Sequence, residues 1–117
     1  MKDANVYLKH VRDAIAKIEA YTKGGRAAFF KNTMIQDSVV RNLEIIGEAV
    51  KNLPAEIKKR HPDVPWRSIT ALRNILIHEY FGVDPKIVWR VVSKRLPLLR
   101  RHILTILSKD KQSGKKA

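Results

Sequence analysis

Apolar residues recur at every third or fourth position along almost the whole chain, which is the spacing of one face of an α-helix. The stretches run from Leu8 to the Gly24-Gly25 pair, from 33 to 53, from Pro54 to His61, from Trp66 to Gly82, and from Asp84 onward. No stretch alternates convincingly at a period of two, so β-strands are not expected. The sequence therefore predicts an all-α domain, a four-helix bundle with a short extra helix.

The chain has 117 residues, enough for one domain with its own core. Pro97 falls inside the last helical stretch and predicts a kink there. The final ten residues, SKDKQSGKKA, are poor in apolar side chains. We therefore expect a helical domain over 1–107 and a basic disordered tail over 108–117.

Charge is the strongest bulk signal, with 24 Lys and Arg against 11 Asp and Glu and a formal net charge of +13. Such an excess favours a polyanionic partner such as RNA, although a basic surface can also serve solubility alone. The absence of cysteine excludes disulfides and thiolate zinc sites. No membrane span and no secretory signal are evident, so a cytoplasmic location is expected.

The run RNILIHEY, residues 73 to 80, places polar residues inside an otherwise apolar helix. At roughly 100° per residue, Asn74 and His78 share one polar face. Arg73 instead lies within the apolar arc, between Trp66 and Tyr80. An arginine there needs a partner group, a second subunit or a phosphate, unless it simply extends past its neighbours to water. Arg73 and His78 are roughly 140° apart on a straight helix, so a symmetric dimer would help them converge.

Arg73, Asn74, His78 and Tyr80 together resemble the R-x(4)-H-x-Y motif of HEPN-superfamily ribonucleases, and more narrowly the HepT toxins of HepT/MntA toxin–antitoxin pairs. The resemblance also includes MIQDSVVRNLEIIGEAVKNLP (34 to 54) and VPWRSITALRNILIHEYFGVD (64 to 84). It implies a homodimeric helical bundle that cleaves RNA without a metal or another cofactor.

Carried over position by position, the resemblance makes His78 the acid/base group, Arg73 the ligand of the scissile phosphate, and Asn74 a supporting residue that orients the pair. It implies a type VII-like toxin silenced by an MntA-like nucleotidyltransferase, which transfers AMP from ATP to Tyr80. These roles suit the residue types. Histidine exchanges protons near neutral pH, and a guanidinium binds two phosphate oxygens at once. Whether the RNA is tRNA or mRNA stays open.

Other readings of the same residues remain. The chain could be a non-catalytic helical dimer that binds RNA or a partner, or a structural dimer whose charge serves solubility. Glu44 and Glu48 lie four residues apart, and we interpret them as a solvated or dimer-lining pair because no third ligand has metal-site spacing. We interpret His10, His61 and His102 as surface residues and Trp66 and Trp89 as core residues.

Overall fold

The described backbone consists of helices joined by short connections. The computed structural model describes residues 4–78 and 84–116, with only the backbone of 77, 78 and 110–116. The elements are α1 (Ala4–Tyr21), α2 (Gly25–Lys31), α3 (Thr33–Lys51), α4 (Ala55–Arg60), α5 (Trp66–His78), α6 (Pro85–Arg90), the π-helical segment η1 (Val91–Arg95) and α7 (Leu96–Lys116). The prediction of an all-α bundle is confirmed within these residues.

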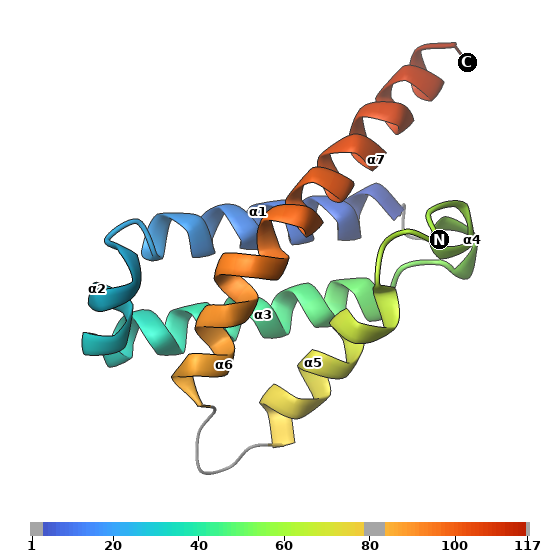
Figure 1. Ribbon diagram of the computed structural model, residues 1–117. Helices are drawn as coiled ribbons and strands as arrows, with labels where there is room; N and C mark the ends of the chain where they lie inside the picture. The colour runs from blue at the N-terminus through green and yellow to red at the C-terminus, as the bar shows by residue number, and fades with distance from the viewer. Residues whose placement is uncertain (1–3, 79–83, 117) are drawn as a thin grey trace.

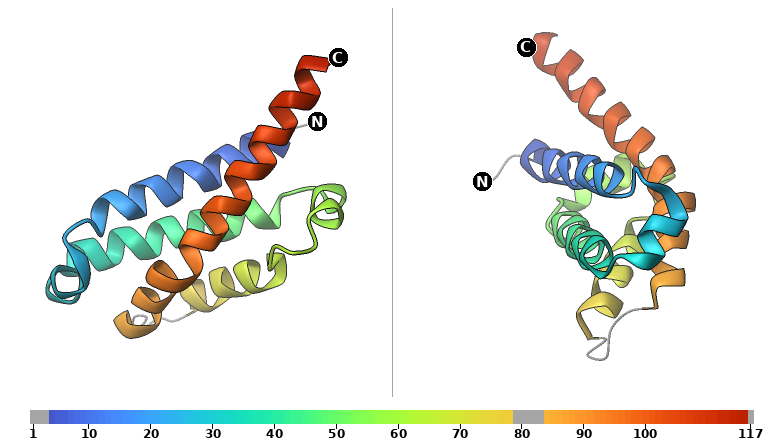
Figure 2. Two further views of the ribbon diagram at one scale, coloured as in Figure 1. Left: turned by 45° about the horizontal axis from the view of Figure 1, so that its top comes forward. Right: turned by 90° about the vertical axis from the view of Figure 1, so that its left-hand side faces the viewer.

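Helix α3 is the centre of the bundle. Figure 1 shows α1 and α3 side by side and antiparallel, and α5 packs on the other side of α3. Helix α7 crosses α1 obliquely, and its C-terminal part projects away from the other helices in both views of Figure 2. Helices α1, α3, α5 and the α6–η1–α7 unit thus form the four-helix bundle, with α2 and α4 as short connecting helices.

The core forms where the apolar faces of these helices meet. Its largest fully buried side chains are Phe29, Leu8, Ile15, Ile18, Ile103 and Ile106. Trp66 is buried and its Nε1 donates to the carbonyl oxygen of His61 at 3.0 Å, while Trp89 packs on Phe29 with ring centroids 5.2 Å apart. Both tryptophans are therefore core residues, as the sequence predicts.

Helix α2 has no counterpart in the helices expected from sequence. Its seven residues are too few to show a clear helical period, and only Phe29 is fully buried, with the partly buried Phe30 packed against the core beside it. Gly25, at its first position, has a φ of +88°, a left-handed conformation that glycine adopts without a steric penalty. The Gly24-Gly25 pair therefore starts a second helix after the turn that follows α1.

The last helical unit is distorted just before Pro97, as expected. Proline has no backbone N–H, so it cannot donate to the carbonyl of Ser93 four residues earlier. The backbone widens here into η1, where the N–H of Leu96 donates to the carbonyl of Val91, five residues back.

Helix α7 continues to Lys116, so the backbone is helical where the sequence predicts a disordered tail from residue 108. The segment after Ile106 contains no proline, and Lys and Gln favour helix, so the hydrogen-bond ladder can propagate outward from the packed part of α7. The division of the chain into a domain and a tail stays a prediction. In the part of the chain that the structure describes, no helix has both the length and the apolar character needed to cross a membrane.

Candidate functional site

Arg73 lies where α5 crosses α3 most closely. A Cβ built on Gly47 of α3 would clash with the Cβ of Arg73 and would lie 3.1 Å from its Cγ and 3.3 Å from its Cα. Only a residue without a side chain fits between the two backbones at this point. The base of the Arg73 side chain is therefore fixed by helix packing, and its guanidinium reaches past Gly47 towards the edge of α3.

The guanidinium of Arg73 is held by Glu48, the residue after Gly47. Its Nε lies 2.6 Å from Oε2 of Glu48 in an ion pair, and the two side chains are 21% and 51% exposed. The other carboxylate oxygen of Glu48 accepts from Nδ2 of Asn52 at 3.4 Å. An ion pair this close favours one orientation of the guanidinium, although the exposed carboxylate limits what the pair adds to stability.

The remaining N–H donors of Arg73 lie on its two Nη atoms. Nη1 is 3.5 Å from Oδ1 of Asn74, at the limit of a hydrogen bond. Because Nε is occupied by Glu48 and the Nη atoms make at most this weak contact in the described structure, the outer edge of the guanidinium can still bind an oxyanion.

A polar hollow of about 360 Å³ opens beside Arg73. Helix α1 contributes Tyr7 and His10, whose rings meet edge to face with centroids 6.5 Å apart. Helix α3 contributes Glu44, Glu48 and Asn52, together with Arg41, which pairs with Glu44 at 3.4 Å. We call this space the Arg73 hollow. Its two carboxylates offset its two guanidinium groups, so an incoming phosphate must compete with Glu48 for Arg73.

Two of the four predicted site residues are brought together. Arg73 and Asn74 are adjacent and in weak contact, and Asn74 is exposed, as its place on the polar face of α5 predicts. His78 is the last residue of α5, where only its backbone is described. Tyr80 lies outside the described residues. The roles assigned to Arg73, Asn74, His78 and Tyr80 therefore all stay predictions.

The sequence interpretation missed the role of Glu48. It treated Glu44 and Glu48 as one pair on a solvated or dimer-lining face, whereas each carboxylate binds a different arginine. The available signal was Gly47, because a glycine inside a long helix often marks the close approach of another backbone. His10 was interpreted as a surface residue; it is exposed, but it also lines the Arg73 hollow. Within the described ranges 4–78 and 84–116, no three His, Asp or Glu side chains cluster as metal ligands would.

Comparison with known proteins identifies the family of the chain. The profile of the family described as "Ribonuclease HepT-like" matches residues 11–106. The chain is 44% identical over 117 residues to "Gamma-glutamylcyclotransferase and putative RNase MJ0434" of Methanocaldococcus jannaschii, covering 98% of this chain and 53% of that protein. It is 42% identical over 112 residues to "Putative RNase TTE0752" of Caldanaerobacter subterraneus, covering 95% of this chain and 100% of the relative.

A further relative is "Probable ribonuclease HepT" of Thermococcus cleftensis, 42% identical over 95 residues that cover 80% of this chain and 86% of the relative. The chain thus spans about half of the Methanocaldococcus protein, 53%, but the whole length of the Caldanaerobacter one, 100%. No solved structure matches. The match to the family profile extends over most of the chain, from α1 to α7, and includes Gly47, Glu48 and the α5 motif. This chain belongs to the HepT-like ribonuclease family.

Proposed function

We propose that this chain is a metal-independent endoribonuclease that acts as a homodimer and serves as the toxin of a toxin–antitoxin pair in the cytoplasm. The observation that carries the proposal is the position of the Arg73 side chain, between Glu48 and the Arg73 hollow. Its guanidinium is oriented by Glu48 at 2.6 Å, yet its Nη edge borders an open polar hollow. Ribonuclease names among the relatives and the net charge of +13 support an RNA substrate.

In the proposed reaction the ribose 2′-hydroxyl is the nucleophile. His78 removes its proton, the 2′-oxygen attacks the adjacent phosphorus, and the bond to the 5′-oxygen breaks as that oxygen receives a proton. The products are a 2′,3′-cyclic phosphate and a 5′-hydroxyl. Arg73 binds the non-bridging oxygens and stabilises the charge that develops on them. In the dimer, two copies of α5 lie near the symmetry axis, so the Arg73 and His78 side chains of both subunits face one cleft.

Cleavage in EDTA tests this proposal. We expect the unmodified protein to cut RNA in EDTA and to leave 2′,3′-cyclic phosphate ends, and we expect His78→Ala to cut about 100-fold more slowly, since a positioned acid or base contributes about that much or more. Gel analysis with end-group mapping measures both. His61→Ala, on the loop before α5, is the matched control and should stay within about threefold of wild type. Cleavage that requires a divalent cation, or that proceeds unchanged in His78→Ala, would contradict the proposal.

We further propose that Tyr80 is the acceptor of AMP. A nucleotidyltransferase antitoxin of the MntA type would catalyse attack of the tyrosine oxygen on the α-phosphorus of ATP, with release of diphosphate and of the phenolic proton. The support is the position of Tyr80 two residues after His78, where an added nucleotide would bring negative charge and bulk to the RNA site.

Intact-mass spectrometry tests this modification. After incubation with ATP and such an enzyme, the wild type should gain one or more AMP units and lose ribonuclease activity. Tyr80→Phe should gain none and stay active, whereas Tyr21→Phe, an exposed tyrosine on α1, should behave like the wild type. An AMP adduct that persists in Tyr80→Phe would place the acceptor elsewhere.

The alternative is a non-catalytic dimer that binds RNA or a protein partner. The observation that favours it is the balance of charges in the Arg73 hollow, where Glu48 already occupies Arg73. It predicts equal RNA binding by the wild type and His78→Ala with no cleavage by either. The cleavage assay detects the missing activity, and a binding titration with the same RNA compares the two affinities.

A further inference from the structure

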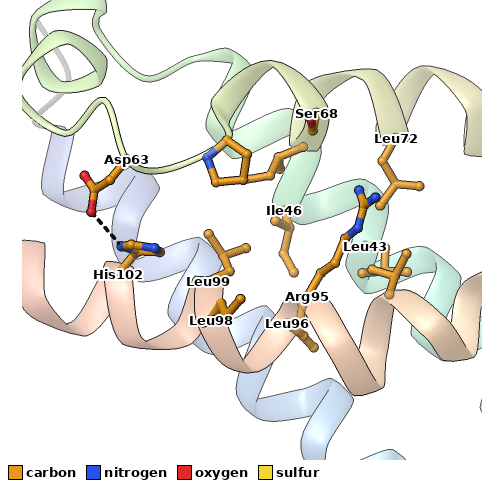
Figure 3. Close-up of a pocket in the computed structure, with 13 residues that line it drawn as sticks. Leu43, Ile46, Asp63, Ser68, Leu72, Arg95, Leu96, Leu98, Leu99 and His102 are labelled. Atoms are coloured by element: carbon orange, nitrogen blue, oxygen red, sulfur yellow. Dashed lines mark ion pairs between the residues drawn. The ribbon is translucent and has the colours of Figure 1, made fainter.

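A second cavity lies between α3, α5 and α7 (Figure 3). We call it the α7 pocket. It has a volume of about 450 Å³ and shares no lining residue with the Arg73 hollow. Its walls are mainly aliphatic and include Leu43, Ile46, Ile69, Leu72, Leu98 and Leu99. Leu98 is 55% exposed, which is unusual for a leucine beside an apolar cavity.

A basic hollow of about 400 Å³ continues from the α7 pocket along α7. The two spaces share Asp63 and His102, which form an ion pair at 3.4 Å drawn as a dashed line in Figure 3. Arg101 and Lys109 of α7 line the basic hollow. The apolar pocket therefore has a cationic extension on the same helix.

The cations around these spaces lack carboxylate partners. Arg95 extends from the α7 side into the pocket in Figure 3. In the part of the chain that the structure describes, Arg95, Arg101 and Lys109 make no ion pair; Arg60 is the exception, because it pairs with Glu56 at 2.6 Å. Among the side chains that the structure describes, Asp63 is the one carboxylate that lines either space, and it already faces His102. A ligand that brings its own carboxylates would complement this surface.

Two other occupants fit less well. A second copy of this chain that docked by the same face would bring its own Arg95, Arg101 and Lys109 against these cations, so the two faces would repel. Proteins usually bind single-stranded RNA by stacking its bases on aromatic rings, and the described residues that line the α7 pocket include no Phe, Tyr or Trp. An aliphatic cavity beside unpaired cations instead suits an apolar anchor side chain flanked by Asp or Glu.

We propose that the α7 pocket and the basic hollow together dock an acidic segment of another protein, which inserts one large apolar side chain beside Leu72, Leu98 and Leu99 and places its carboxylates against Arg95, Arg101 and Lys109. This docking site is separate from the Arg73 hollow, so it can be tested independently of ribonuclease activity.

The probe is a fluorescein-labelled helical peptide of about 14 residues, mostly glutamate, with two leucines spaced four residues apart so that they share one face. We expect anisotropy titrations to show saturable binding to the full-length protein. Leu98→Asp and Arg101→Glu should each weaken binding at least about tenfold, the scale of one anchor contact. Leu104→Asp, at a partly exposed site of α7 outside both spaces, and Arg12→Glu, on α1, are the matched controls and should change binding less than about threefold.

Three results would overturn the proposal. Equal binding of a control peptide with serines in place of the leucines would leave only nonspecific charge attraction. An equal loss of affinity for a single-stranded RNA oligomer in Leu98→Asp would make the pocket an RNA site. Sedimentation that showed Leu98→Asp turning a dimer into monomers would assign the face to a second copy. Circular dichroism of each variant confirms that the fold is retained.

Discussion

Replacing Arg73 with alanine is expected to lower kcat/KM for RNA cleavage by about 1,000-fold, the scale observed when a preorganised cation or donor is removed from a developing oxyanion. Arg73→Lys should remain about 100-fold impaired although it keeps the charge. A lysine has a single ammonium group, which cannot pair with Glu48 and also bind two phosphate oxygens side by side. The planar guanidinium of arginine pairs with Glu48 through Nε and can bind the substrate through its two Nη atoms. Initial rates on a defined RNA oligomer measure both variants.

The control for this prediction is Arg12→Lys, an exposed arginine of α1 that pairs with the neighbouring Asp13. It should leave the rate within about twofold, because surface ion pairs of this kind contribute little. The melting temperature of Arg73→Lys should also change little, since Glu48 is 51% exposed and the pair is largely screened by water. Full activity in Arg73→Lys would mean that only the charge at position 73 matters, and near-wild-type cleavage in Arg73→Ala would remove Arg73 from the site.

Periodicity made the long helices predictable. The stripes of α1 and α3 appear in the sequence at the positions where the structure buries them, and Pro97 marks the distortion at η1. Helix α2 was missed because seven residues with a single buried phenylalanine show no measurable period. The backbone of α7 is helical to Lys116, because low hydrophobicity removes packing partners without preventing a helix from growing outward from its packed half. The division into a domain and a tail at residue 108 stays a prediction.

The sequence predicted Arg73 as a site residue but did not predict the residue that pairs with it. The position of Arg73 on an apolar arc signalled that it needed a partner, and the structure supplies Glu48. The identity of that partner depends on how α3 and α5 cross, which a single sequence does not state. Helical spacing relates residues within one helix, whereas the Arg73 hollow combines α1, α3 and α5.

The second prediction with a large expected effect is a substitution of Gly47, where α3 and α5 cross. Gly47→Ala should destabilise the protein by about 1–3 kcal/mol, the usual cost of adding a methylene to a filled space, even though alanine favours helix by up to about 1 kcal/mol over glycine. The new methyl would overlap the Cβ of Arg73, so the helices must separate. Because the same movement displaces the Arg73 guanidinium, cleavage should also fall at least tenfold. Thermal melts and initial rates measure the two effects.

A double-mutant cycle tests whether contact with the Cβ of Arg73 causes the loss of stability in Gly47→Ala. Arg73→Ala retains the Cβ that the new methyl would meet, whereas Arg73→Gly removes it. Gly47→Ala should therefore cost as much stability in the Arg73→Ala background as in the wild type, and should become neutral or stabilising in the Arg73→Gly background. Equal costs in all three backgrounds would show that the methyl clashes with something other than Arg73. If the cycle behaves as expected, one glycine sets both the distance between α3 and α5 and the place of the guanidinium, because it brings Glu48 within 2.6 Å of Arg73.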